Sequence, residues 1–251
     1  MTAPRPQPER IDLSQADDPR DVVHRVVACL AQGGVVGLAT ETASGLAASA
    51  LQPAAVTKIR QVKGLDPATP LTLLLKGAGE VADWVPDLCQ TGRRFARRAW
   101  PGPVTLLFPG PSARGLTHRL PPEARHRISP DEKVALHVPA HPFVREVLRL
   151  LPGPLVLSEA HDPETGVATT PEPLEEIPGL VMIVEDGPTR IGQVATVVRV
   201  EEERWSIVRP GVVDAATLAR MAGTILLFVC TGNTCRSPMA EALCKLLLAQ
   251  R

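Results

Sequence analysis

One stretch near the C-terminal end has the residue types and the spacing of a phosphate-binding loop. Cys230 is followed by five residues and then by Arg236 and Ser237. In such a loop the backbone N–H groups turn inward, the positive end of the next helix adds to the field, and the arginine contacts two phosphate oxygens. The same field favours a thiolate, so Cys230 is predicted to be a nucleophile with a lowered pKa.

The residues around this loop must supply the elements that position it. Residues 225–229 form an apolar run that predicts a strand, and a helix is expected to begin near Pro238. Ser237 could donate to the departing thiolate, Asn233 could take left-handed backbone geometry, and Cys235 could trap oxidised Cys230 as a disulfide.

This strand, loop and helix resemble the start of the low-molecular-weight tyrosine phosphatases. Their general acid is an aspartate in a distant Asp-Pro-Tyr segment, and no Asp-Pro follows Cys230 here. A leaving group that departs without this acid reacts about 10²- to 10⁴-fold more slowly. We therefore expect residues 223–251 to be a truncated phosphatase fusion with a vestigial site, which docks on the rest of the chain, is disordered, or belongs to a longer polypeptide.

The overall composition limits the remaining possibilities. The chain has 251 residues and a formal net charge of zero, so it has no long-range field to gather nucleic acid, and RNA binding would need a local basic patch. The five cysteines lack zinc-ligand spacing, and the N-terminus lacks a signal peptide, which predicts a reducing cytoplasm. No apolar run approaches the ~20 residues that span a bilayer.

Periodicity predicts an α/β fold, with a mixed twisted sheet and packed helices over residues 20–222. Residues 1–19 are expected to be a flexible leader, with a short edge strand over 11–13. Helices are expected over 22–30, 53–62 and the arginines at 93–98, and a turn over 40–45. Strands are expected over these ranges: 35–38, 71–75, 104–108, 134–138, 155–157, 181–184 and 196–200.

A series of short motifs gives this larger part a family resemblance. Each motif is weak alone, but their order is specific, and the segment resembles the YrdC/YciO-type threonylcarbamoyl-AMP synthase family. The motifs are Gly33–Leu46 with Thr40-Glu41-Thr42, Lys63-Gly64-Leu65, Pro70-Leu71, Trp100–Thr105, Val138-Pro139, Ser158, Gly192–Val198 and Arg209-Pro210-Gly211.

The resemblance implies a nucleotidyltransferase for tRNA modification. Threonine and bicarbonate would form a carbamate that attacks the α-phosphate of ATP and releases pyrophosphate. Magnesium is expected only as part of the ATP complex, because no carboxylate cluster resembles a metal cage. The implied substrate- and ATP-binding residues are Thr40, Thr42, Lys63, Thr105, Ser158, Thr196 and Arg209.

Five positions depart from the family pattern, and two of them are Ala39 and Ser44, which replace an expected proline and tyrosine. The other three matter more for the site. Leu65 and His137 stand where arginines are expected, and Ala160 replaces an asparagine. Two lost charged contacts would remove roughly 3 to 6 kcal/mol, which compensation from Arg60 or the 93–98 arginines could offset. A non-catalytic module that binds nucleotide or double-stranded RNA is therefore the alternative. The arginine stripe itself could equally be a solvated helix face.

Overall fold

A single mixed sheet organises the computed structural model, which describes residues 7–109, 115–160, 168–169, 172–175 and 177–250. Within these residues the strand order is β1-β8-β2-β3-β7-β4-β6-β5-β9-β10, with both parallel and antiparallel neighbours. This confirms the predicted fold class. The strands are β1 (Glu9–Asp12), β2 (Val36–Ala39), β3 (Ser44–Ser49), β4 (Thr72–Leu74), β5 (Val104–Phe108), β6 (Val134–His137), β7 (Leu155–Glu159), β8 (Met182–Glu185), β9 (Thr196–Glu201) and β10 (Arg204–Arg209).

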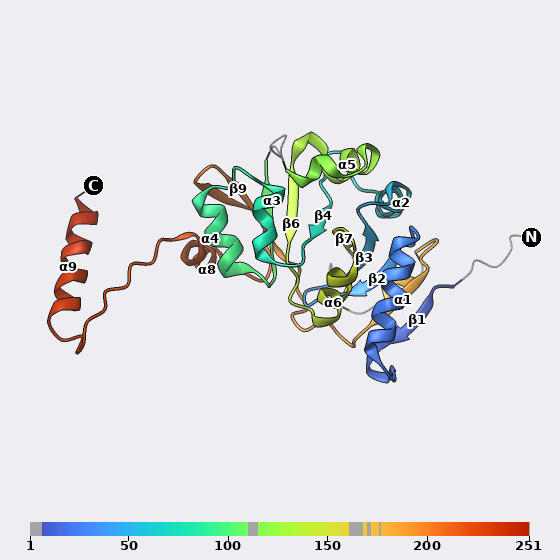
Figure 1. The fold of residues 1–251 in the computed structure, drawn as a ribbon, viewed down its shortest axis with the longest axis horizontal. Helices are drawn as coiled ribbons and strands as arrows, with labels where there is room; N and C mark the ends of the chain where they lie inside the picture. The colour runs from blue at the N-terminus through green and yellow to red at the C-terminus, as the bar shows by residue number, and fades with distance from the viewer. Residues whose placement is uncertain (1–6, 110–114, 161–167, 170–171, 176, 251) are drawn as a thin grey trace, which may run out of the picture.

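Helices connect these strands and pack on the sheet (Figure 1). Asp18 caps the first helix through the N–H of Arg20, and Gly64 ends the second in the left-handed conformation that favours glycine. The helices are α1 (Pro19–Ala31), α2 (Pro53–Lys63), α3 (Val81–Trp84), α4 (Gln90–Ala99), α5 (Pro122–Ile128), α6 (Pro142–Leu150), α7 (Glu172–Glu175), α8 (Ala215–Ala222) and α9 (Arg236–Ala249).

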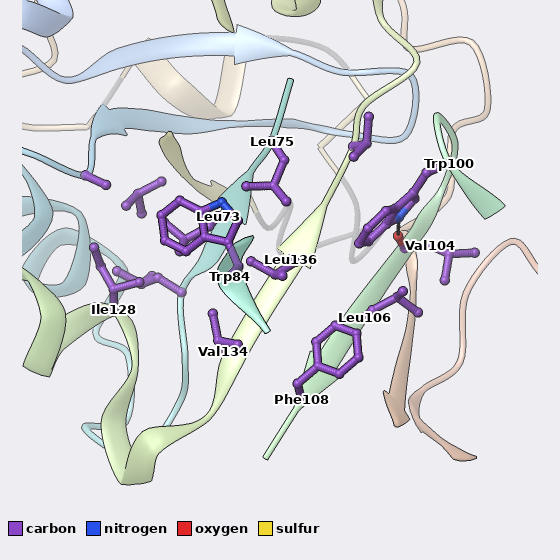
Figure 2. Close-up of a cluster of buried hydrophobic side chains, with 14 of the residues drawn as sticks. Leu73, Leu75, Trp84, Trp100, Val104, Leu106, Phe108, Ile128, Val134 and Leu136 are labelled. Atoms are coloured by element: carbon purple, nitrogen blue, oxygen red, sulfur yellow. Dashed lines mark hydrogen bonds between the residues drawn. The ribbon is translucent and has the colours of Figure 1, made fainter. Parts of the chain in front are cut away.

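Two apolar clusters lie on the two faces of the sheet. Alternation along β3 shows this, since Leu46 and Ala48 belong to one cluster and Ala47 to the other. The larger cluster contains residues of α2, α4, α5 and α8, and Figure 2 shows Leu73, Leu106 and Leu136 of three strands within it. The smaller cluster contains residues of α1 and α6, which contact each other. The second face is therefore covered over only part of its width.

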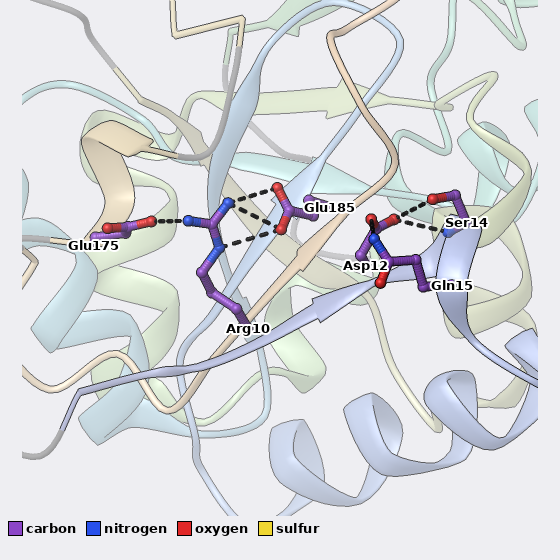
Figure 3. Close-up of polar contacts among 6 residues, drawn as sticks. All are labelled: Arg10, Asp12, Ser14, Gln15, Glu175 and Glu185. Atoms are coloured by element: carbon purple, nitrogen blue, oxygen red, sulfur yellow. Dashed lines mark hydrogen bonds and ion pairs between the residues drawn. The ribbon is translucent and has the colours of Figure 1, made fainter.

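The described part of the predicted flexible leader is ordered, which corrects that expectation. Residues 9–12 form β1, which pairs in parallel with β8 at the edge of the sheet. Figure 3 shows Arg10 between Glu185 and Glu175, with Arg10 Nη2 2.9 Å from Glu185 Oε2, while Asp12 caps the short turn that follows. The short edge strand was predicted, but two residues late. Residues 1–6 lie outside the described part.

Two strands were missed by the sequence analysis. β3 lies partly in the expected turn over 40–45, and it consists of small residues, Ser, Gly and Ala, around one leucine, all of them buried. Such residues have low strand propensity, so burial between β2 and β7 decides their conformation. β10 is an edge strand whose residues are mostly exposed, which weakens the apolar signal.

The predicted strand over 225–229 is not formed. Figure 1 shows these residues running away from the sheet to α9. The side chains of Ile225, Leu227 and Val229 are exposed to 70%, 82% and 81%. A strand needs a neighbour to pair its backbone groups, and none of the described residues pairs with this segment. The segment therefore does not dock on the first domain.

The arginine stripe of α4 is used partly for packing. Arg94 Nη1 donates to Ala222 O at 3.0 Å, and Arg98 Nη1 donates to Met221 O at 2.9 Å and Gly223 O at 2.6 Å. These carbonyls end α8, whose last turn has no following helical N–H groups to satisfy them. Two of the four arginines thus hold α8 against α4 instead of forming a free basic surface. No helix in the described residues is long and apolar enough to cross a membrane.

Candidate functional site

A pocket of about 410 Å³ lies over the part of the sheet that α1 and α6 leave uncovered. It collects six of the seven binding residues predicted from the motifs, from segments far apart in the sequence. Its lining residues are Thr40, Thr42, Lys63, Leu65, Thr69, Pro70, Leu71, Thr72, Thr105, Leu107, Ala135, His137, Leu157, Ser158, Glu159, Ala160, Val194, Val197, Val208 and Arg209.

Strand alternation builds the floor of this pocket. Leu106 and Leu136 point into the larger core, so their neighbours on β5 and β6 point to the opposite face. Thr105 and His137 form one neighbouring pair there, with Thr105 Oγ1 3.2 Å from His137 Nδ1. The floor is therefore fixed by the sheet register rather than by flexible loops.

Lys63 is the last residue of α2 and reaches the pocket half-buried. Burial lowers the pKa of its ammonium group, and the nearby Glu159 carboxylate partly opposes this effect. Arg60, one turn earlier, is fully used elsewhere, since its guanidinium donates to the carbonyl oxygens of Thr69, Arg127 and Asp66 at 2.8, 2.8 and 2.5 Å. Arg60 holds the loop that carries Leu65, and does not compensate for a missing cation.

Arg209 lies at the pocket edge in an ion pair that the sequence analysis did not foresee. Its Nη2 atom is 2.6 Å from Glu159 Oε2 and donates to Ala195 O at 3.0 Å. Glu159 therefore brings a carboxylate into a pocket expected to bind phosphate. Its position between Ser158 and Ala160 in the motif was the only available signal, and the sequence alone does not tell which way it points.

Thr40 and Thr42 lie in the turn between β2 and β3. The Thr40 hydroxyl donates to Ala43 O at 2.7 Å and lies 3.0 Å from Thr42 Oγ1. Both side chains line the pocket, and Thr40 also satisfies the backbone of its own turn. Thr40 therefore lines the pocket and has a structural role in its turn, and its substrate-binding role stays a prediction.

Thr196 is the predicted binding residue that the structure does not bring to the pocket. It is fully buried, and its hydroxyl donates to Val213 O at 3.0 Å and accepts from Val213 N at 2.9 Å. These two bonds fasten β9 to the segment before α8. We correct the expected nucleotide-binding role of Thr196 to a structural one, because its polar group is occupied away from the pocket.

Leu65, Ala160 and His137, three of the departures from the family pattern, line the pocket. Leu65 and Ala160 contribute apolar surface, and His137 is buried with its Nε2 atom 3.6 Å from Glu41 Oε1. Arg60, Arg94 and Arg98, which could compensate, donate to backbone carbonyls and do not line the pocket. The cations that line the pocket are Lys63 and Arg209 among the described residues, and Arg209 is paired.

Glu41 was missed as a functional candidate, although it lies between the two predicted threonines. Its side chain is 3% exposed, and Oε2 accepts from the N–H of His141 at 3.2 Å. Burial by itself raises the pKa of Glu41, but His137 and the N–H of Ala140 outweigh it, so the pKa lies below its ordinary value. Glu41 is thus an ionised carboxylate behind the pocket wall.

Gly45 allows β3 and β7 to approach next to the pocket. A Cβ atom on Gly45 would lie 2.7 Å from Ser158 O and 3.2 Å from Glu159 Cα, both backbone atoms. We expect Gly45→Ala to lower the free energy of unfolding by about 1 to 3 kcal/mol, measured by urea denaturation. Gly77→Ala is the control, since nothing lies within 4 Å of its added Cβ. Equal stability of both variants would contradict this account.

The Cys230 loop is shaped as the spacing predicts, but no strand precedes it. Asn233 has the expected left-handed φ of 48°, and its N–H donates to Cys230 Sγ at 3.2 Å. α9 begins at Arg236, two residues before the predicted start. The hydroxyl and the backbone N–H of Ser237, which lie near the sulfur, lower the pKa of Cys230 to about 7. Cys235 is a free, exposed thiol.

This pKa predicts the pH dependence of Cys230 alkylation. A thiol with a pKa of about 7 is half ionised near pH 7, and only the thiolate reacts. We expect iodoacetamide to modify Cys230 with a rate that is half-maximal near pH 7, followed by peptide mass spectrometry. Cys29, whose pKa is raised by burial, is the internal control. A half-maximal rate above pH 8 would show that the loop does not stabilise the thiolate.

The described residues contain no group of three or more His, Cys, Asp and Glu side chains that could hold an ion. The donor set of the pocket, hydroxyls with Lys63 and Arg209, suits anions better than a divalent cation.

Comparisons with known proteins assign the two parts of the chain. A family model described as "Telomere recombination", for Sua5, YciO and YrdC proteins, matches residues 28–211, and the model of the low-molecular-weight phosphotyrosine protein phosphatases matches 225–251. The threonylcarbamoyl-AMP synthase of Pyrococcus abyssi is 27% identical over 77% of this chain and 55% of its own length. That of Mus musculus is 30% identical over 81% of this chain and 70% of its own.

Solved structures agree with this assignment. Two structures of Pyrococcus abyssi Sua5, the second in complex with L-threonine, superimpose with TM-scores of 0.74 and 0.71 at 25% and 24% identity. Each covers 86% of this chain, and 64% and 60% of the Sua5 chains. The chain thus spans just over half the length of the archaeal synthase that it matches. With its family match over residues 28–211 and this shared fold, the chain belongs to the Sua5/YciO/YrdC family.

Proposed function

We propose that the pocket makes threonylcarbamoyl-AMP from ATP, L-threonine and bicarbonate, for tRNA modification. The observation that carries this proposal is the convergence of Thr40, Thr42, Lys63, Thr105, Ser158 and Arg209 on one cavity. The relatives named threonylcarbamoyl-AMP synthase support it. So does the Sua5 structure in complex with L-threonine.

Different residues of the pocket suit different parts of the substrates. Lys63 is a point charge for a phosphate group, and Arg209 adds a second one when Glu159 releases it. The Ser158 hydroxyl can bond polar groups of threonine or nucleotide, and so can the lone pairs of Thr42 Oγ1, which lies 3.0 Å from Thr40 Oγ1. The amine of threonine and bicarbonate give a carbamate and water, and a carbamate oxygen then displaces pyrophosphate from the α-phosphorus. Magnesium would enter bound to ATP.

The direct test uses the full chain with ATP, magnesium, bicarbonate and L-threonine. We expect pyrophosphate release that depends on threonine, together with an adenylate product detected by mass spectrometry. Cys230→Ser should behave as the unchanged protein, because α9 and its loop lie away from the pocket (Figure 1). No threonine-dependent product from a folded protein would leave a nucleotide-binding module as the better interpretation.

A second candidate function belongs to the Cys230 loop. Its lowered pKa gives a thiolate at neutral pH, which favours anion binding or a slow attack on an aryl phosphate. Hydrolysis of p-nitrophenyl phosphate that disappears in Cys230→Ser and survives loss of Lys63 would support it. Phosphatase activity at the full rate is not proposed, because no strand among the described residues pairs with the segment before the loop.

Binding of double-stranded RNA without turnover is the remaining alternative for the main domain. It would rest on the α4 arginines, of which Arg93 and Arg97 are not held by α8. A salt-dependent shift of a labelled duplex that is lost in an Arg93→Ala/Arg97→Ala variant would favour it. A reducing compartment such as the cytoplasm is the proposed location, where the five cysteines remain free thiols.

A further inference from the structure

Three neighbouring side chains in and behind the pocket, those of Thr105, His137 and Glu41, place a histidine ring between a hydroxyl and a carboxylate. Thr105 Oγ1 lies 3.2 Å from His137 Nδ1, and His137 Nε2 lies 3.6 Å from Glu41 Oε1. Thr105 and His137 line the pocket, while Glu41 lies on the turn behind it. The two ring nitrogens of His137 therefore face different partners, which fixes the orientation of the ring.

Burial makes this arrangement chemically unusual. The side chains of His137 and Glu41 are 5% and 3% exposed, so neither is a surface group. Glu41 Oε1 has no hydrogen-bond partner, which is costly for a buried carboxylate oxygen unless a positive charge appears beside it. Among the described residues, the ring of His137 faces this oxygen, with Nε2 at 3.6 Å.

We propose that His137 is the proton acceptor of the pocket, acting through Thr105 and balanced by Glu41. This rests on the proposed synthase function, in which the ammonium group of threonine must lose a proton before its nitrogen can attack bicarbonate. The substrate N–H bond breaks as Thr105 Oγ gains that proton, and the Thr105 hydroxyl proton passes to His137 Nδ1. The resulting imidazolium is neutralised by Glu41. Carbon–nitrogen bond formation then releases water.

The other charged groups near His137 lie around these three side chains. Lys63, Glu159 and Arg209 line the same pocket, and Glu159 and Arg209 neutralise each other. Behind Glu41 lies His141, whose backbone N–H donates to Glu41 Oε2 and whose ring faces Asp186 at 3.5 Å. Burial and the charge of Arg190 lower the pKa of His141, although Asp186 and Glu41 oppose this. Glu41 thus faces His141 N–H with Oε2 and His137 with Oε1.

The test compares two replacements of His137 that separate charge from proton transfer. His137→Gln removes both, whereas His137→Arg keeps a permanent cation that cannot accept a proton at neutral pH. The family pattern has an arginine at position 137, and the proposal is that in this chain a base has replaced it, so we expect both variants to lower kcat for threonine-dependent pyrophosphate release at least tenfold. The acid limb of the pH profile should disappear in His137→Gln. Threonine and ADP dissociation constants, measured by calorimetry, should stay within about threefold in His137→Gln. His126→Gln, on an exposed helix face, is the control.

The outcomes are distinct. Full activity of His137→Arg would overturn the proposal, because it would show that the pocket needs a cation there and not a base. Proton NMR titration of the His137 ring in the unchanged protein is the second measurement and needs no turnover. A ring that changes protonation between pH 5 and 9 is required, and one that does not would overturn the relay. Absence of any product from the unchanged protein, with a titrating ring, would instead contradict the synthase function.

Discussion

Replacing Lys63 by alanine is expected to lower threonine-dependent pyrophosphate release by about 10²-fold. Among the described residues, Lys63 is the pocket-lining cation that no carboxylate holds at ion-pair distance, since Arg209 is bound to Glu159. A hydrogen bond to a charged group contributes about 1.5 to 3 kcal/mol, which corresponds to roughly 10- to 150-fold in rate. The measurement is kcat/KM for ATP at saturating threonine.

Two comparisons make this result specific. Lys58→Ala removes a lysine from the same helix, where it contacts Gly179 O away from the pocket, and should leave the rate unchanged. Lys63→Arg keeps the charge and should retain most activity. Because burial lowers the pKa of Lys63, the unchanged protein should lose activity on the alkaline side at lower pH than an exposed lysine would, and Lys63→Arg should not. Equal rates for Lys63→Ala and Lys58→Ala would remove Lys63 from the site.

Replacing Leu65 by arginine is expected to raise ATP affinity and the synthase rate by on the order of 10- to 100-fold. Leu65 lines the pocket on the loop that Arg60 fastens, so a longer cationic side chain there enters a prepared position. A guanidinium offers a planar fork for phosphate oxygens that a leucine cannot replace. The affinity is measured by calorimetry with a non-hydrolysable ATP analogue, and the rate by pyrophosphate release.

The matched control for this gain is Gln61→Arg. Gln61 is exposed on α2, the helix before the loop that carries Leu65, and its replacement by arginine adds the same charge outside the pocket. A gain in Leu65→Arg alone would show that the pocket lacks a specific cation. An equal gain in both variants would point to net charge, and no gain in either would contradict the view that the phosphate site is short of charge. Adding Glu159→Gln to Leu65→Arg tests whether that carboxylate captures the new arginine.

The pocket has few cations that could bind a phosphate group. Arg60, Arg94 and Arg98 were candidates to replace the missing arginines, but each donates to backbone carbonyls that end a helix or hold a loop. Such carbonyls are costly to leave without partners in a folded protein. These arginines therefore stabilise the fold through backbone carbonyls. The polar groups that line the pocket are instead Lys63, Arg209 and the hydroxyls.

The sequence by itself determined the family, the α/β class and four of the nine helices in the described residues, α1, α2, α4 and α9. α1 and α2 follow from apolar spacing with Asp18 and Gly64 at their ends, because caps and periodicity are local. The order of motifs also identified six residues of the pocket, since they lie at the ends of elements that the sheet brings together. The left-handed Asn233 and the lowered pKa of Cys230 were predicted from loop spacing alone.

Only the tertiary structure decided which polar groups remain available for chemistry. Thr196 is taken up by the backbone of Val213, Arg209 by Glu159, and Glu41 faces His137 from a distant turn. β3 forms because its small residues are buried between two strands, whereas residues 225–229, more apolar, form none because no strand lies beside them. Pairing of backbone groups and of buried charges is set by neighbours far away in the chain, and no local pattern contains that information.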